Sequence, residues 1–287
     1  LSPVSAQNFD SIYYRKSIIT AFKEAGFQTA FFSNQRYNHS FIDFFGMEAD
    51  TYDFIKEDSQ DSQYNPSDDE LLMLVEKELE KGNRKQFIVL HTYGSHFNYR
   101  ERYPETAAFF LPDFPVDAEV KYKDNLMNAY DNSIRYTDNF LARIIHLLKQ
   151  QQVDASMLYT SDHGEDIFDD GRHLFLHASP VPSYYQLHVP LLLWTSDSYR
   201  EEYPGIEKAA SMNRQKNISS SISFFQTMME LAGIETPYRN DSLSVTSPLY
   251  TEKSRVYLND HNEPHSLDDI GMRKEDFEML KKRGIDA

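Results

Sequence analysis

Residues 157–164 read Met-Leu-Tyr-Thr-Ser-Asp-His-Gly, an apolar run that passes directly into a carboxylate and an imidazole. The apolar run predicts a strand, and in open α/β sheets ligands bind at the carboxyl ends of the strands. An oxygen donor beside a nitrogen donor suits Zn²⁺ or Mn²⁺. A plain turn is the alternative, because Ser, Asp and Gly are common turn residues. We therefore expect Asp162 and His163 at a sheet edge, as metal ligands or as part of a turn.

The composition is that of a folded globular protein, and it excludes several classes of function. The 287 residues are 40% hydrophobic with a formal net charge of −16, so nucleic acid is not expected as a partner. There is no cysteine, which excludes zinc ribbons and thiol nucleophiles. No apolar run approaches the ~20 residues that span a bilayer. The sequence begins with Leu1 and opens in a predicted loop, so we expect a piece of a longer protein.

Helical and extended apolar segments alternate along the chain, which indicates an α/β protein. Apolar residues at helical spacing predict helices over 17–25, 67–81, 121–150 and 217–232. Continuous apolar runs predict strands over 29–32, 87–90, 157–159, 188–194 and 255–258. Such runs are typical of parallel strands that are covered on both faces. We therefore predict a single domain over residues 1–287, an α/β/α sandwich with a mostly parallel central sheet.

Two local patterns predict where helices begin and end. Gly26 follows the first predicted helix and is expected to cap its C-terminus. Ser67 and Glu70 form a capping-box pattern at the start of the second predicted helix. The charged tail after Asp268 is expected to form a peripheral helix.

Polar residues of one kind follow the predicted strands. They are Asn34 after the first strand, His91 and His96 after the second, Asp162 and His163 after the third, and His177 in the next loop. Because parallel strands bring these ends to one edge of the sheet, three of these four histidines and a carboxylate could bind one or two divalent cations there. For His91 a buried structural role is the preferred interpretation. Glu165 is interpreted either as a group that orients His163 or as a solvated loop carboxylate.

The residues alone therefore indicate an α/β hydrolase or transferase with a metal site at the sheet edge. Two neighbouring metal ions would clamp an in-line displacement at phosphorus or sulfur.

Four segments give this chain a resemblance to a known family, and a fifth segment follows the last of them. They are AFKEAGFQTAFFSNQ (21–35), VLHTYGSHFNYRERYP (89–104), AYDNSIRYTDNFLARIIHLLK (129–149) and LYTSDHGEDIFDDGRHLFLHASP (158–180), followed by HVPLLLW (188–194). In order and spacing the chain resembles the catalytic domain of phosphoethanolamine transferases. These are membrane-anchored bacterial enzymes of the alkaline phosphatase and sulfatase superfamily. The resemblance implies an alkaline-phosphatase-like fold.

The resemblance also implies roles for particular residues. Asp162 and His163 match the pair that binds the catalytic zinc. His96 and His177 match histidines that face the substrate phosphate or a second zinc, and that act in catalysis. Asn34 matches a recurrent asparagine that is expected to support the site from outside the ligand set, as Glu165 is. The family continues with Gly-Pro after the first of these histidines, whereas Phe97 and Asn98 follow His96 here, so the local loop is expected to differ.

The implied reaction is a transfer of phosphoethanolamine in two steps. A threonine hydroxyl attacks the phosphorus of phosphatidylethanolamine and diacylglycerol leaves, and then a lipid A or glycan hydroxyl attacks the phospho-threonine. That threonine, an acidic zinc ligand and the transmembrane region would all precede Leu1. This chain alone is therefore expected to be inactive and to bind Zn²⁺ or Mn²⁺ incompletely, as one or two ions. The resemblance places the full-length protein at the periplasmic face of the bacterial inner membrane.

Two other functions remain open from the sequence. One is a sulfatase or a phosphoglycerol transferase on the same fold. The other is a domain without catalytic activity that binds glycan or lipid headgroups.

Overall fold

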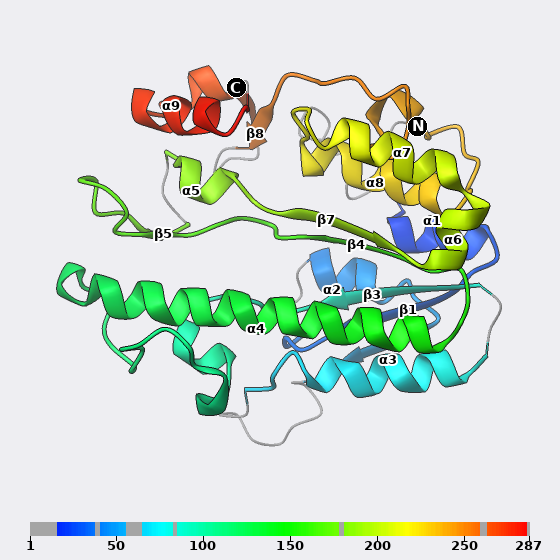
Figure 1. Ribbon diagram of the computed structural model, residues 1–287, viewed down its shortest axis with the longest axis horizontal. Coiled ribbons are helices and arrows are strands. Elements are labelled where there is room, and N and C mark those ends of the chain that lie inside the picture. The colour runs from blue at the N-terminus through cyan, green and yellow to red at the C-terminus, as the bar shows by residue number, and fades with distance from the viewer. Residues whose placement is uncertain are drawn as a thin grey trace. The chain divides into compact units, whose positions relative to one another are not determined.

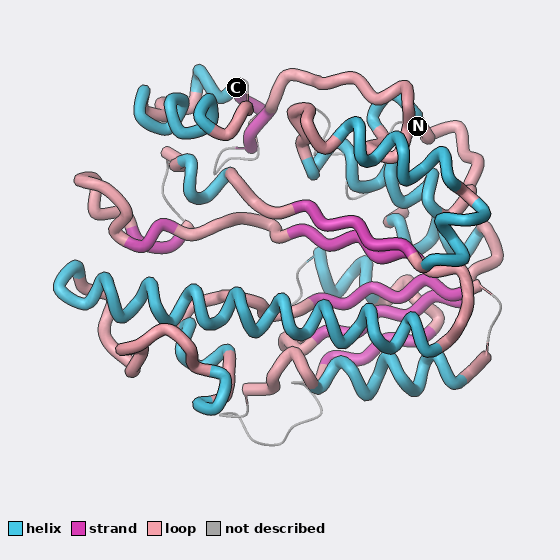
Figure 2. Tube along the Cα trace, in the orientation of Figure 1, coloured by secondary structure: helices cyan, strands magenta, loops and turns pink. Residues whose placement is uncertain are grey.

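The computed structural model describes residues 16–37, 41–55, 65–82, 85–177, 181–258 and 263–285 (Figure 1, Figure 2). The chain divides into two compact units, of which one is residues 16–151 and the other contains the described residues from 152 onward. In these described ranges, no helix has both the length and the apolar sequence that a bilayer crossing needs. The single domain expected over residues 1–287 stays a prediction.

The unit of residues 16–151 is built on a three-stranded parallel sheet with the strand order β2-β1-β3. The strands are β1 (Gln28–Ser33), β2 (Thr51–Phe54) and β3 (Gln86–His91). The helices are α1 (Ile18–Glu24), α2 (Phe41–Gly46), α3 (Glu70–Glu80) and α4 (Lys123–Gln150), with 3-10 turns at Tyr99–Arg102, Glu105–Ala107 and Val120–Tyr122. The central strand β1 carries the buried residues Ala30, Phe31 and Phe32. The predicted α/β class and the parallel pairing of its first strands are thus confirmed.

Helix α1 begins and ends close to where the sequence predicts. The Ser17 hydroxyl accepts a hydrogen bond from the Ile19 N–H at 3.0 Å and caps the first turn. Gly26 has a φ of 83°, and beyond it the Phe27 N–H donates to the Phe22 carbonyl at 3.1 Å. A glycine reaches this left-handed conformation without strain, so the helix stops and the chain enters β1 two residues later.

Helix α3 begins at Glu70, three residues later than predicted. The Glu70 carboxylate accepts the Ser67 N–H at 3.2 Å, which is half of the expected capping box. The Ser67 hydroxyl, however, accepts from Asp69 at 3.3 Å. Residues 68–69 form a turn because the Asp68 carboxylate is engaged elsewhere, by the N–H groups of Tyr93 at 2.9 Å and Gly94 at 3.0 Å.

The long helix α4 fixes a loop through one buried side chain. Asn132 is fully buried, and its carbonyl oxygen accepts the N–H groups of Phe109 and Phe110, both at 2.9 Å. Its amide nitrogen donates to the Phe110 carbonyl at 3.0 Å and to Asp113 at 3.2 Å. Asp113 also accepts the Tyr103 hydroxyl at 2.7 Å, and burial together with that bond raises the pKa of Tyr103 to about 12.

The other unit contains a two-stranded sheet in which β4 (Ser156–Thr160) pairs antiparallel with β7 (Leu191–Thr195). The continuous apolar runs predict both strands in a mostly parallel sheet, whereas these two strands run antiparallel. A continuous apolar run fits either direction, and here the antiparallel register pairs Ser156 with Thr195 and Thr160 with Leu191. The connection of residues 161–190 contains, among those described, two short strands and a four-residue helix. These are β5 (Asp166–Ile167), β6 (Phe175–Leu176) and α5 (Tyr184–Leu187).

The remaining elements of this unit follow β7. They are α6 (Asp197–Glu202), α7 (Pro204–Asn213), α8 (Ser220–Leu231), 3-10 turns at Asp241–Leu243 and Leu267–Asp269, β8 (Val256–Leu258), β9 (Pro264–Ser266) and α9 (Lys274–Lys282). Helix α9 is the helix expected after Asp268. It contributes Leu280 to a core cluster with Tyr184, Leu267 and Met272, and therefore packs on α5.

Candidate metal site

The motif of residues 161–164 forms a tight turn directly after β4. The Ser161 hydroxyl donates to the His163 carbonyl at 2.8 Å, and the His163 N–H donates to Asp162 Oδ1 at 3.0 Å. These short-range bonds are those of a turn built on Ser and Asp side chains. The chain bends at Asp162, and these contacts fit the turn interpretation without excluding metal binding. The assignment of Asp162 and His163 as metal ligands stays a prediction.

Gly164 is required at its position by close packing. A Cβ atom built on Gly164 would lie 2.0 Å from the carbonyl oxygen of Tyr185, and the Gly164 N–H donates to the Gln186 carbonyl at 2.8 Å. The backbone after His163 thus lies directly against α5, where no side chain fits.

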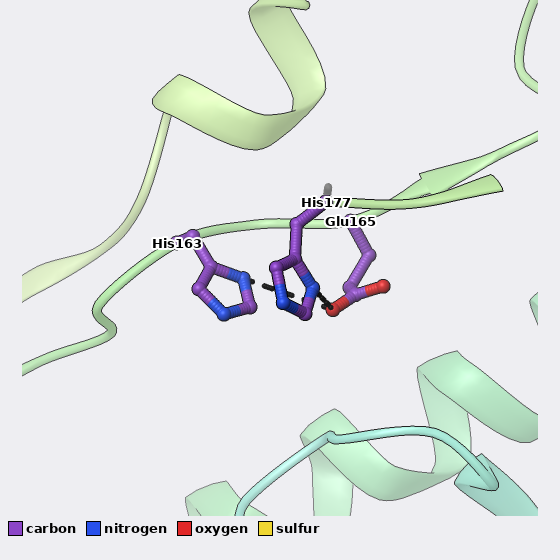
Figure 3. A group of neighbouring side chains, drawn as sticks. All are labelled: His163, Glu165 and His177. Carbon is purple, nitrogen blue, oxygen red and sulfur yellow. Dashed lines mark hydrogen bonds and ion pairs between the residues drawn. The ribbon is translucent and has the colours of Figure 1, made fainter. Parts of the chain in front are cut away.

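Glu165 and His177 are brought together by the short hairpin of β5 and β6. The two strands pair antiparallel with Asp166 opposite Leu176, so the residues one step outside that pair are neighbours. Glu165 Oε1 lies 2.8 Å from His177 Nδ1 (Figure 3). A carboxylate only accepts, so in the neutral ring Nδ1 carries the proton and Nε2 carries the lone pair.

His163 completes a three-residue cluster with these two residues. Its Nδ1 lies 3.7 Å from Glu165 Oε1, and its ring stacks on the His177 ring with centroids 3.6 Å apart (Figure 3). The Glu165 side chain is only 5% exposed, whereas the two histidine side chains are about one-third exposed, at 33% and 35%. One potential ligand atom from each residue lies within 4.8 Å of the others. The cluster thus combines one buried carboxylate with two partly exposed imidazole rings.

Asp162 lies beside the other nitrogen of His163. Its side chain is 85% exposed, and its Oδ2 is 3.6 Å from His163 Nε2. His163 Nδ1 is 3.0 Å from the Gly164 carbonyl, which only accepts, so in the neutral ring Nε2 carries the lone pair. Two lone-pair donors at this separation repel each other unless a proton or a cation lies between them. Zinc ligands lie about 2 Å from the ion, so this donor pair fits a shared cation.

The residues beside the cluster are held in place by α5. Asp166 is buried, and it accepts hydrogen bonds from the Ser183 hydroxyl at 2.8 Å and from the Gln186 side-chain amide. Burial raises the pKa of Asp166. Asp166 directly follows Glu165, and Gly164 directly precedes it. Contacts with α5 and with Ser183 therefore fix the backbone on both sides of Glu165.

Asn34 belongs to the unit of residues 16–151, where it follows β1 and is fully buried. Its amide nitrogen donates to Asp68 at 2.5 Å, and its carbonyl oxygen has no hydrogen-bond partner among the described residues. Asp68 in turn accepts the N–H groups of Tyr93 and Gly94, in the loop that leads to His96. Asn34 therefore supports this loop through Asp68, and its expected role at the metal site stays a prediction.

His96 lies on an exposed part of that loop. Its Nδ1 is 2.5 Å from the Phe97 carbonyl, and its ring meets the Tyr93 ring edge-on at a centroid distance of 5.1 Å. The peptide bond between Phe97 and Asn98 is cis, at the place where the family has Gly-Pro. His96 and the cluster belong to different units, so its predicted part in catalysis and metal binding stays a prediction.

His91 is half-buried and not fully buried as expected, and its contacts are those of a structural histidine. Ser33 Oγ lies 2.9 Å from His91 Nδ1, and Gln35 Nε2 lies 3.3 Å from His91 Nε2. Both ring nitrogens are thus engaged by residues at or just after the end of the neighbouring strand β1.

Among the residues of the candidate site, the position of Glu165 was the least well predicted from the sequence. It was expected to support His163 from outside the ligand set, but it lies against both histidines and is itself a possible ligand. The signal that could have found this is the pair of acidic residues directly after the Ser-Asp-His-Gly motif. That signal is weak, because a register of two paired residues cannot be inferred from hydrophobic pattern.

Comparison with known proteins places the chain in a family of enzymes. The family model described as "Sulfatase" matches residues 3–234, and the chain belongs to this family. Within it, the chain is similar to the phosphoethanolamine transferase EptA of Escherichia coli strain K12, with 36% identity over 157 residues. This match covers 53% of the chain and 28% of that enzyme. The chain is also 32% identical over 178 residues to the Kdo(2)-lipid A phosphoethanolamine 7''-transferase of the same strain, covering 59% of the chain and 31% of that protein.

A solved structure confirms the predicted fold. The C-terminal periplasmic domain of EptC from Escherichia coli, in complex with Zn, matches with a TM-score of 0.82 and 24% identity. The match covers 94% of this chain and 77% of that domain. The predicted α/β fold is thus confirmed. The similarity to the two transferases confirms the resemblance to phosphoethanolamine transferases.

Proposed function

We propose that the protein transfers phosphoethanolamine from phosphatidylethanolamine to a lipid A or glycan acceptor, on the periplasmic face of the bacterial inner membrane. The observation that carries the proposal is the cluster that His163, within the motif of residues 161–164, forms with Glu165 and His177, in a chain of the sulfatase family. The names of its relatives support the chemistry, since both transfer phosphoethanolamine and one is named for Kdo(2)-lipid A. The similar solved domain is periplasmic.

We propose Zn²⁺ as the cofactor, with Mn²⁺ as the alternative and one or two ions bound. The similar EptC domain was solved in complex with Zn. Asp162 and His163 Nε2 would hold an ion, and the cluster of His163, Glu165 and His177 provides the further donors. Two imidazoles and carboxylates form a donor set that zinc accepts. A bound divalent cation would act as a Lewis acid on the phosphoryl oxygens.

In this proposal, Glu165 orients the His177 ring for general acid–base catalysis. The 2.8 Å contact holds the ring through Nδ1, so Nε2 is the atom that would bind an ion or exchange a proton with an ester oxygen. Because the Glu165 side chain is only 5% exposed, its charge is weakly screened and the orientation of the ring is well defined. His96 is proposed as a second histidine at the substrate phosphate.

The nucleophile of the first step is proposed to be a threonine outside these 287 residues. Its oxygen would bond to phosphorus as the diacylglycerol oxygen leaves and takes a proton, and the acceptor hydroxyl would then displace it. This chain would hold the phosphoryl group and supply or remove the protons. The 287 residues alone are accordingly proposed to be inactive.

The test uses the full-length protein in vesicles that contain phosphatidylethanolamine, with Kdo(2)-lipid A as the acceptor. Mass spectrometry of the acceptor measures transfer for the wild type, for His177→Ala and for His173→Ala. His173 is an exposed histidine in the loop between β5 and β6 of the same hairpin and is the matched control. We expect His177→Ala to reduce transfer at least about a hundredfold, as for a general acid–base group. Equal transfer by His177→Ala and wild type would contradict the proposal.

The second candidate function is sulfate ester or phosphoglycerol chemistry, which the match to the sulfatase family model supports. The same assay includes an aryl sulfate and a phosphatidylglycerol donor. Turnover of either one without transfer of phosphoethanolamine would favour this candidate. No turnover of any donor by the full-length protein would favour a binding domain.

A further inference from the structure

We propose that Asp276, on the C-terminal helix α9, is a positioning residue for the cluster of His163, Glu165 and His177. This inference rests on the proposed function of that cluster as a metal site. Asp276 lies beyond residue 234, where the match to the sulfatase family model ends. It acts through two structures that border the cluster: the loop between β5 and β6, and helix α5.

The first link is a buried ion pair between Asp276 and Arg172, in the loop between β5 and β6. Arg172 Nη1 donates to Asp276 Oδ2 at 2.7 Å, and Nη2 donates to Oδ1 at 2.9 Å. The Asp276 side chain is 2% exposed, and the Arg172 side chain is 6% exposed. Two parallel bonds of this kind fix direction as well as distance. Arg172 also binds Asp170 of the same loop, and this contact lowers the pKa of Asp170.

The second link joins the same carboxylate to α5. The N–H of Tyr184, the first residue of α5, donates to Asp276 Oδ1 at 2.9 Å. The Arg273 N–H, at the start of α9, donates to Asp276 Oδ2 at 3.2 Å. One buried carboxylate therefore receives hydrogen bonds from the hairpin loop, from α5 and from α9 itself.

Both linked structures continue to the cluster. Helix α5 and the residue before it bind the neighbours of Glu165, through the Gly164 N–H to the Gln186 carbonyl at 2.8 Å and through the Ser183 hydroxyl to Asp166 at 2.8 Å. The hairpin carries Glu165 before β5 and His177 after β6. A shift of the hairpin loop relative to α5 would therefore change the distance between the carboxylate and the His177 ring. Asp276 opposes that shift because it is bonded to both.

The alternative is that α9 merely completes the hydrophobic core. Its Leu280 packs with Tyr184, Leu267 and Met272, and this apolar contact alone would retain the helix. Apolar contacts tolerate small displacements. Removal of one partner of a buried ion pair, in contrast, strongly destabilises the folded protein. The two roles predict different results when the charge of Asp276 is removed and the apolar contacts are kept.

The experiment compares Asp276→Asn with Glu275→Gln in the full-length protein. Glu275 is the exposed neighbour on the same helix, so its variant controls for the loss of one acidic charge. Two quantities are measured: hydrogen exchange of the amides of residues 165–177 without metal, and the affinity for Zn²⁺ by competition with a chelating dye. We expect faster exchange in 165–177 but not in β4 or β7, and Zn²⁺ binding about tenfold weaker, as for groups that orient ligands. Exchange and affinity equal to those of Glu275→Gln would overturn the proposal.

Two further variants keep the result decisive. If Asp276→Asn does not fold, Arg172→Lys replaces it, since lysine retains the charge but cannot form the two parallel bonds. The same two measurements then decide, and wild-type values for both would overturn the proposal. His163→Ala tests the metal site separately. If it binds Zn²⁺ as the wild type does, the proposed metal site fails, while hydrogen exchange still decides whether Asp276 positions the hairpin.

Discussion

Glu165 and His177 meet where β5 begins and β6 ends, with 2.8 Å between Oε1 and Nδ1, although they are twelve positions apart along the chain. A hairpin of two paired residues on each strand makes this contact, and the ring of His163 lies against it. The three residues of the cluster thus come from one stretch of fifteen residues, 163–177. The geometry of the site depends on how that stretch is held.

Different substitutions within residues 163–177 should weaken the affinity for Zn²⁺ by different factors. We expect His163→Ala to weaken Zn²⁺ binding at least about a hundredfold, because its Nε2 lies 3.6 Å from Asp162 Oδ2 and its Nδ1 lies 3.7 Å from Glu165 Oε1. Glu165→Gln should weaken it about 10–100-fold, the usual cost of losing a group that orients a histidine ligand. Isothermal titration calorimetry measures both, with the exposed His173→Ala as the control. A Glu165→Gln protein with wild-type affinity would exclude Glu165 from the site.

Asp162→Asn tests which nitrogen of His163 serves a metal ion. If an ion lies between Asp162 Oδ2 and His163 Nε2, this variant should weaken Zn²⁺ binding as strongly as His163→Ala does. The absorption spectrum of Co²⁺ bound in place of zinc should change as well, since an oxygen donor is lost. An unchanged spectrum would place the ion on the side of Glu165 and His177.

Gly164→Ala should destabilise the unit that contains residues 152–285. The new methyl group would lie 2.0 Å from the Tyr185 carbonyl, which is backbone and cannot move without α5. We expect a loss of about 1–3 kcal/mol in the free energy of unfolding, as for other overpacked sites. The control is Gly171→Ala in the neighbouring loop, where nothing lies within 4 Å of the new atom. Urea unfolding that gives the same midpoint for both variants would contradict the close packing.

Asn132→Ala should release the loop of residues 109–113. The substitution leaves the N–H groups of Phe109 and Phe110 without their acceptor, which costs about 1–3 kcal/mol in total. Asn128→Ala, which removes one exposed bond to the Pro112 carbonyl, should cost less than about 1 kcal/mol. Urea unfolding and hydrogen exchange at residues 109 and 110 distinguish these results. Equal effects of the two variants would show that Asn132 does not anchor the loop.

Asp68 should make the stability of the folded protein depend on pH. Burial raises its pKa above the ordinary value, against the opposing effects of the Tyr93 and Gly94 N–H groups and of Arg102. The folded state therefore holds the proton more firmly than the unfolded state does. This stabilisation is fully present below the unfolded pKa, near 3.9, and is lost as the pH rises through the folded pKa. Asp68→Asn should lack this dependence.

Urea unfolding of wild type and Asp68→Asn between pH 4 and pH 7 measures the effect. The stability of the wild type relative to the variant should decrease as the pH rises. A relative stability that increases with pH would mean that the charged carboxylate is preferred in the folded state.

Much of the fold was predictable from the sequence because long apolar runs and caps determine it locally. The predicted strands over 29–32 and 87–90 correspond to β1 and β3, and the helix predicted over 121–150 corresponds to α4. The direction of β7 was not predictable, because a continuous apolar run looks the same in parallel and antiparallel pairs. The helix over 67–81 was predicted to begin too early, since a contact of Asp68 with residues far along the chain decides its start.

The candidate site was predicted in its residue types but not in its geometry. Asp162 and His163 were recognised from the strand that precedes them, which is a local signal. The contact between Glu165 and His177 arises from a register of two residues and from α5, which packs on Gly164 and Asp166. Neither leaves a periodic pattern in the sequence. The place of His96 relative to the cluster depends on both units and stays a prediction.

The anchoring of residues 109 and 110 by Asn132 has a consequence for how this protein can diverge from its relatives. Every bond from Asn132 to these two residues reaches a main-chain atom, and the side chain of Phe109 is 64% exposed. The path of the loop is therefore independent of which side chains it displays. Homologous proteins could exchange both phenylalanines for other residues and keep the loop in place, so the surface can evolve there while its shape is conserved.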